Sequence, residues 1–73
     1  MDVQFGKLEV GARFLVRNTV SGEVEPDCPI REKIEPFEWK LGRRVNAKYE
    51  DTHRKFRFLY DFFRDDEEVV SVS

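Results

Sequence analysis

The chain has 73 residues, of which 13 are Lys or Arg and 15 are Asp or Glu, so its formal net charge is −2. A chain of this length forms one small domain, residues 1–73, with too thin a core for a buried active-site cavity, which favours a binding protein over an enzyme. The single cysteine excludes an internal disulfide, and the lack of a long apolar run predicts a cytosolic protein.

The first segment predicts a tight turn followed by a strand. Glycines at positions 6 and 11 permit backbone angles that other residues avoid. From Ala12 onwards, Phe14 and Val16 alternate with Arg13 and Arg17. This alternation predicts a strand with one buried face.

A loop and a second strand are expected next. Residues 18–29 contain Asn, Ser, Gly, two Pro and three acids, a composition typical of a mobile, acidic loop. Alternation returns at Ile30 and Ile34 and predicts a strand. We expect Pro36 to end this strand, because proline has no N–H for the ladder and restricts the residue before it.

Residues 36–41 then predict a turn or a single helical turn, which Gly42 closes. The stretch that follows, 43–49, alternates cleanly and predicts a strand. Its two faces carry Val45, Ala47 and Tyr49 on one side and Arg44, Asn46 and Lys48 on the other.

The aromatic segment 56–63 fits two templates. As a strand, it places Phe56, Phe58, Tyr60 and Phe62 on one face. As a helix, it forms the stripe Phe56, Leu59, Tyr60 and Phe63. The density of aromatic residues and the neighbouring strands favour a strand, although a helix over 52–63 stays open. Under either template some apolar side chains remain exposed.

The acidic run 65–68 predicts a turn, and Val70 and Val72 predict a short tail that pairs as an edge strand or frays. Four or five short strands with a spacing of roughly ten residues predict an all-β domain. The expected architecture is a small antiparallel sheet curled into a roll or barrel, with a short helix near 36–41 or 52–63 as the open alternative.

Residues suited to catalysis or metal binding are sparse. His53 and Cys28 are the only imidazole and thiol, so this chain alone cannot form a tetrahedral nitrogen and sulfur site. The acids at 65–68 lack the ligand spacing and the turn glycine of a calcium loop. No glycine run could cradle a phosphate. We therefore expect no catalytic residue, no metal and no cofactor.

Positive charge is concentrated between Lys40 and Arg57, where seven Lys or Arg face two acids and the local charge is +5. Three interpretations stay open: a surface for an acidic protein, a phosphate-binding surface for nucleic acid, and a solvated face that pairs with the chain's own acids. Trp39 is either an interface anchor or a plug in the core. The candidate partner-binding residues are Trp39, Arg43, Arg44, Lys48, Arg54, Lys55 and Arg57.

Four short motifs resemble a pattern found in small phage and bacterial β-proteins. They are F-G-K-L-E-V-G-A-R-F at 5–14, K-I-E-P at 33–36, R-V-N-A at 44–47 and F-F-R-D-D-E-E-V at 62–69. In that group F-x-x-L-x-x-G-x-x-F, K-I, N-A and F-x-D-D recur in this order. The chain departs from the pattern in the loop 18–29 and at 50–55, where the group has a glycine-containing hairpin turn. The motif positions read as fold determinants, namely Leu8, Gly11, Phe14, Ile34, Asn46 and Ala47.

Within this group the chain resembles the RNA-polymerase-binding transcription regulators of lytic Xanthomonas phages. The resemblance implies a non-enzymatic protein of the host cytoplasm, monomeric when free, that contacts the N-terminal region of the largest polymerase subunit, close to nascent RNA. It also implies inhibition of initiation by sigma displacement, and antitermination. A single-stranded nucleic-acid-binding module, an inhibitor of another host complex and a virion assembly protein are the alternatives.

Overall fold

The computed structural model describes residues 1–51, 54 and 57–72. Within them the chain forms six strands and one short 3₁₀ helix, which confirms the all-β prediction. The elements are β1 (Asp2–Gln4), η1 (Phe5–Lys7), β2 (Arg13–Leu15), β3 (Arg31–Trp39), β4 (Arg43–Glu50), β5 (Phe58–Asp61) and β6 (Glu68–Ser71).

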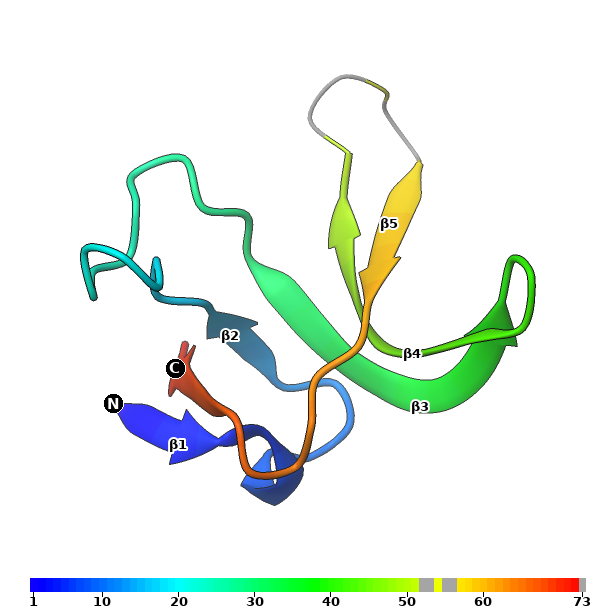
Figure 1. Cartoon of the computed structure of the whole chain (residues 1–73), viewed down its shortest axis with the longest axis horizontal. Helices are drawn as coiled ribbons and strands as arrows, with labels where there is room; N and C mark the ends of the chain where they lie inside the picture. Colours follow the sequence, from blue (N-terminus) through cyan, green and yellow to red (C-terminus); the bar gives the residue numbers. More distant parts are fainter. Residues whose placement is uncertain (52–53, 55–56, 73) are drawn as a thin grey trace.

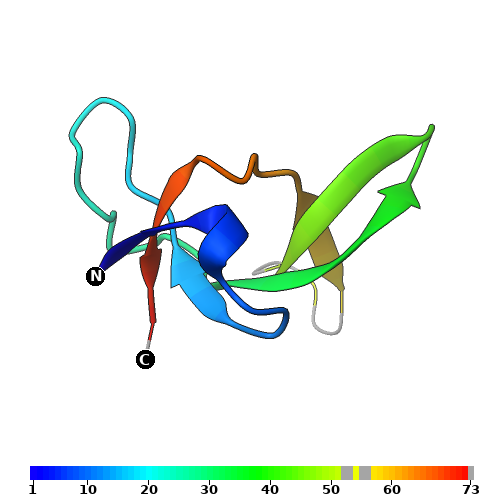
Figure 2. The same cartoon turned by 90° about the horizontal axis from the view of Figure 1, so that it is seen from below.

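All six strands belong to one antiparallel sheet in the order β1-β6-β2-β3-β4-β5. The long strands β3 and β4 curve together, so that their hairpin extends away from the end formed by β1, β2 and β6 (Figure 1, Figure 2). The sheet is therefore curled, as predicted. It is not closed into a barrel, because β1 and β5 form its two edges and do not pair with each other in the described part of the chain.

Three phenylalanine rings form the centre of the core. Phe5, Phe14 and Phe63 lie 5.3–5.4 Å apart between ring centroids, and each is at most 8% exposed. Ala47 and Val69 complete this buried cluster. The alternation at β2 thus correctly predicted the burial of Phe14, while Phe5 enters the core from η1, which the sequence did not predict as a helix.

A close approach of two turns holds η1 in place. The N–H groups of Phe5 and Gly6 donate to the carbonyl oxygens of Glu67 and Asp65, at 2.7 and 2.9 Å. A Cβ atom at Gly6 would lie 2.7 Å from the Cβ of Asp65, so the position requires glycine. Lys33 completes the clamp, since its Nζ donates to the carbonyl oxygens of Phe5 (3.0 Å) and Leu8 (2.7 Å).

Asn46 interrupts the alternation that β4 was expected to follow, because Val45, Asn46 and Ala47 are all buried in succession. Its side-chain amide replaces a peptide group. Nδ2 donates to the carbonyl oxygen of Phe63 at 2.8 Å, and the N–H of Phe63 donates to Oδ1 at 2.9 Å. These two bonds fix the chain just after β5 and bring Phe63 into the core, so the motif position Asn46 is a fold determinant.

The prediction that Pro36 ends its strand is wrong, and of the two alternatives for 36–41, a turn or a helical turn, a turn forms, at 40–42. Strand β3 continues through Pro36 to Trp39. The ladder to β4 pairs Lys33 with Ala47 and then Phe37 with Val45, with a register shift between them. Pro36 lies in this irregular part of the strand, so its missing N–H costs no regular ladder bond.

The tail prediction is also wrong, because β6 is neither an edge strand nor frayed. It lies between β1 and β2 and pairs with both. The sequence analysis did not predict the three-residue strand β1, which covers the outer edge of β6. Val69, at 2% exposed, is the tail residue that enters the core.

In the described part of the aromatic segment, the structure forms a strand and not a helix. Strand β5 spans Phe58–Asp61, and residues 52, 53, 55 and 56 lie outside the described residues. The strand ends at Asp61, and beyond it Phe62 is 51% exposed and Phe63 is 8% exposed. Residues 18–29 form a loop without helix or strand, as predicted, and their mobility stays a prediction.

Candidate protein-binding surface

The β3–β4 hairpin closes with a tight turn, in which Lys40, Leu41 and Gly42 separate the paired residues Trp39 and Arg43. The N–H of Arg43 donates to the carbonyl oxygen of Lys40 at 3.3 Å. The two residues between them both have positive φ, 60° for Leu41 and 74° for Gly42. Positive φ at both central residues is the feature of a type I′ turn, in which Asn and Gly are the favoured residues. The turn places Trp39 and Arg43 directly opposite each other in the ladder.

A second group of three rings lies behind this turn. Tyr60 of β5 contacts Phe37 and Trp39 of β3, with centroid separations of 5.2 and 5.0 Å. Val45 is fully buried opposite Phe37, yet it does not belong to the phenylalanine core. The rings therefore brace the hairpin from outside the main core.

Three cations lie on this side of the sheet, and the first of them is Arg43, which is opposite Trp39 in the ladder. Lys40 Nζ lies 5.1 Å from the centroid of the Trp39 ring, and Lys48 Nζ lies 4.6 Å from that of Phe58. Lys48 also pairs with Tyr60 across β4 and β5, and residues directly opposite each other in a ladder share a face. This continuous set, the aromatic–basic surface, consists of Phe37, Trp39, Lys40, Arg43, Lys48, Phe58 and Tyr60.

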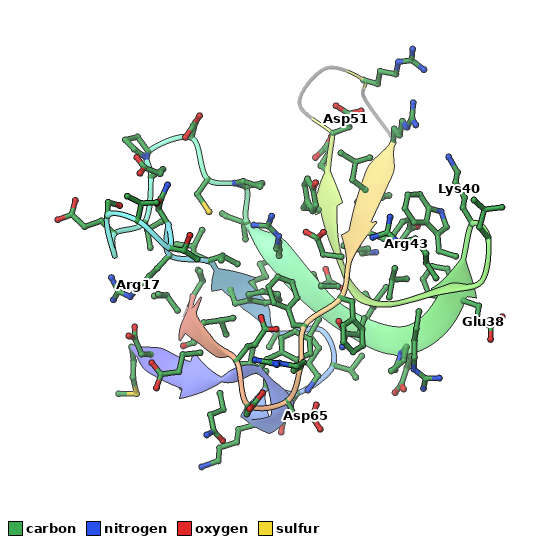
Figure 3. The ribbon with its side chains drawn as sticks, viewed as in Figure 1. Arg17, Glu38, Lys40, Arg43, Asp51 and Asp65 are labelled. Carbon is green, nitrogen blue, oxygen red and sulfur yellow. The ribbon has the colours of Figure 1, made fainter. Side chains whose placement is uncertain are left out.

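The hairpin separates the adjacent arginines at 43 and 44. Arg43 lies opposite Trp39, whereas Arg44 lies opposite Glu38. Figure 3 shows Lys40 and Arg43 on one side of the hairpin and Glu38 pointing away from it. Arg44 instead lines a shallow hollow of about 430 Å³, together with Pro36, Asn46, Phe62, Phe63, Arg64 and Asp65.

The structure thus divides the predicted partner-binding residues. Trp39, Arg43 and Lys48 share the aromatic–basic surface, while Arg44 lies outside it. Arg54 and Arg57 are exposed beyond the other end of β4, where the N–H of Asp51 donates to the carbonyl oxygen of Arg57 at 2.9 Å. Lys55 lies outside the described residues.

The cations of this surface are not paired with a carboxylate, as is also true of Arg13 and Arg44 elsewhere in the described part of the chain. Among the described residues, Lys40, Arg43 and Lys48 form no ion pair within 4.0 Å. The ion pairs found there are Arg17 with Asp2 (2.9 Å), Arg31 with Asp61 (3.0 Å), and Arg64 with Asp66 (3.4 Å) and Glu67 (3.6 Å). The surface therefore retains positive charge that an external acidic group can meet.

A neighbouring groove has mixed charge. It has a volume of about 270 Å³ between β2, β3, β4 and β5, and cations and acids both line it. Arg31 is held there by Asp61 and by the Tyr49 ring, 4.7 Å from its guanidinium carbon. Because Arg31 is already paired, we assign it a structural role.

The candidate residues from the sequence did not include four members of the surface, namely Phe37, Lys40, Phe58 and Tyr60. The expected strand end at Pro36 concealed the fact that Phe37 and Trp39 alternate on one strand. The strand template for 56–63 did carry a signal for Tyr60, since it placed Tyr60 on one face with Phe58.

The described part of the chain has no cluster of three or more His, Cys, Asp or Glu side chains able to hold a metal ion. It also has no helix of the length and apolar character needed to cross a membrane. No family model matches the sequence, and neither a curated protein nor a solved structure matches it.

Proposed function

We propose that this chain is a non-enzymatic, phage-encoded regulator that binds host bacterial RNA polymerase through the aromatic–basic surface. The observation that carries the proposal is the set of cations on this surface that lack partners among the described acids, next to Trp39 and Tyr60. Tryptophan, tyrosine and arginine are the residues that most often dominate the energy of protein interfaces.

The charge distribution supports an acidic protein as the target. Residues 30–63 hold nine Lys or Arg and six acids, whereas the rest of the chain holds four and nine. The two parts therefore carry charges of +3 and −5. Such an asymmetry orients the basic part towards an acidic surface and accelerates association.

The choice of polymerase as the partner rests on the resemblance of the sequence motifs. In the proposed mechanism, the chain acts in the host cytoplasm and occludes a surface near the N-terminal region of the largest subunit. Sigma factor then loses a contact it needs for initiation, and the same occupancy near the RNA exit region promotes antitermination. The protein acts in stoichiometric amounts because it performs no reaction.

The test is the affinity of the labelled protein for purified bacterial RNA polymerase core enzyme, measured by fluorescence anisotropy. We expect Arg43→Glu to weaken binding about tenfold or more. Arg44→Glu is the matched control, because the same charge change then lies opposite Glu38, and we expect less than about a threefold effect. Competition with sigma factor should fall in parallel with affinity.

Equal binding by wild type and Arg43→Glu places the site elsewhere, and no binding by wild type overturns the proposed function. Single-stranded nucleic acid is the competing ligand. Lys40 and Lys48 already lie over the Trp39 and Phe58 rings on which bases would stack. We therefore expect no salt-sensitive retardation of labelled single-stranded RNA, and clear retardation contradicts the proposal.

A further inference from the structure

Leu41 occupies the apex of the β3–β4 hairpin with a fully exposed side chain, at a relative exposure of 103%. It is also the only non-glycine residue with positive φ in the described part of the chain, at 60°. Type I′ turns favour Asn-Gly, because asparagine tolerates this left-handed conformation and a larger side chain is strained in it. Here the turn reads Leu-Gly.

Folding stability does not explain a leucine at this position. The side chain contacts no core residue, so it returns no hydrophobic stabilisation for the strain of its backbone. Val20 is comparably exposed at 95%, but it lies in the loop 18–29 and does not have positive φ. Leu41 thus combines two unfavourable features that Val20 does not.

The base of the hairpin holds Leu41 in a defined place. Tyr60 packs against both Phe37 and Trp39, and Lys40 lies over the Trp39 ring. A braced hairpin loses little conformational entropy when it binds, which favours its tip as an interface anchor. Lys40 and Arg43 flank Leu41 on both sides of the turn, and neither has an acidic partner among the described residues.

We infer that Leu41 is the apolar anchor of the interface and enters an apolar pocket on the polymerase that carboxylates surround. The partner is inferred from charge complementarity. Cations lie on both sides of Leu41, so a pocket that receives it is favoured when acidic residues surround that pocket. The inference rests on the proposed function and adds the contact that the basic residues alone do not give. An apolar anchor within a polar rim is the usual composition of an energetic hot spot.

The test compares Leu41→Asn with Val20→Asn in the same polymerase binding assay. Leu41→Asn suits the type I′ turn, so we expect its melting temperature to equal or exceed that of wild type. Its affinity should nevertheless fall about tenfold or more, because the apolar contact is lost. Val20→Asn should bind like wild type, and Leu41→Met, which keeps an apolar side chain, should stay within about threefold of wild type.

Three outcomes separate this inference from the function on which it rests. Loss of affinity in Leu41→Asn but not in Val20→Asn, with an unchanged or higher melting temperature, supports the anchor. Wild-type affinity in Leu41→Asn, alongside weak binding by Arg43→Glu, overturns the anchor and leaves the proposed function standing. Failure of the wild-type chain to bind polymerase overturns the proposed function and the anchor with it.

Discussion

Two clusters of three aromatic rings occupy different regions of this small sheet. The core rings Phe5, Phe14 and Phe63 lie 5.3–5.4 Å apart, and Tyr60 contacts its two partner rings at 5.0 and 5.2 Å. The separations are nearly equal, but the burial is not, since Phe14 is fully buried and Phe37 is 39% exposed. Ring packing alone therefore does not distinguish a core from a binding surface.

The hydrogen bonds of the cations beside the two clusters do distinguish the core from the binding surface. Lys33 Nζ lies 4.7 Å from the Phe5 ring, and two backbone carbonyl groups accept its hydrogen bonds. Lys40 lies at a similar distance from Trp39, 5.1 Å, with no hydrogen-bond acceptor among the described residues. A cation whose donors are satisfied internally stabilises the fold, whereas one with unused donors can bind an external acid.

Replacing one ring in each cluster with alanine should give the largest difference in unfolding free energy between two variants. We expect Phe14→Ala to lower the free energy of unfolding by about 3–5 kcal/mol, through lost burial and the cavity left behind. Stability of small domains is commonly a few kcal/mol, so this variant should be largely unfolded. Tyr60→Ala removes partly exposed contacts and should cost about 1–2 kcal/mol, measured by denaturant unfolding.

Binding to polymerase is compared between wild type and Tyr60→Ala, because Phe14→Ala is expected to be largely unfolded. Folded Tyr60→Ala should bind polymerase more weakly than wild type, because the support of Trp39 and of the hairpin is lost. Equal destabilisation by Tyr60→Ala and Phe14→Ala would show that both clusters are structural cores and would remove the argument for a surface.

Removal of the two hydrogen bonds between Asn46 and Phe63 is expected to give the next largest effect. Asn46→Ala leaves the N–H and the carbonyl of Phe63 without their partners at a buried site, so we expect a loss of about 2–4 kcal/mol in unfolding free energy. Asn18→Ala is the matched control. Its Oδ1 accepts bonds from the N–H groups of Val20 and Ser21, at 2.7 and 3.2 Å, in an exposed loop.

Water replaces the bonds lost in Asn18→Ala, so its cost should be below about 1 kcal/mol. Similar losses of unfolding free energy in the two alanine variants would contradict the conclusion that Asn46 is a buried fold determinant.

Periodicity predicted the local part of this fold. Alternation around Phe14 and along 43–49 identified β2 and β4, because one buried face imposes a period of two on a strand. It failed where partners distant in sequence decide the outcome. Three residues at the N-terminus convert the tail into an internal strand, and a register shift opposite β4 lets β3 pass through Pro36.

For the candidate site, too, the sequence predicted local features but not contacts between residues that are distant in the chain. Composition identified the basic segment, and adjacency suggested that Arg43 and Arg44 act together. Neighbouring residues in a strand point to opposite faces, so the fold separates them. The pairing of Trp39 with Tyr60 depends on how β5 returns along β4, which no local pattern contains.

The ion pair of Asp2 and Arg17 should give the smallest effect, although its dependence on pH is distinctive. Arg17 Nη2 lies 2.9 Å from Asp2 Oδ1 and joins β1 to the segment after β2. The hydrogen bond from Arg17 is the main reason that the pKa of Asp2 lies below its ordinary value of 3.8. A carboxylate whose folded pKa is lowered stabilises the fold above the unfolded pKa, and this stabilisation is lost as the pH falls through the folded pKa.

Asp2→Asn should therefore lower the melting temperature slightly and by a constant amount at pH values well above 3.8. The difference from wild type should shrink as the pH falls below that value, and added salt should reduce it because both side chains are exposed. Thermal unfolding of both proteins across this range provides the measurement. A difference that grows on acidification has the wrong sign for this pair and would show that Asp2 acts through contacts other than Arg17.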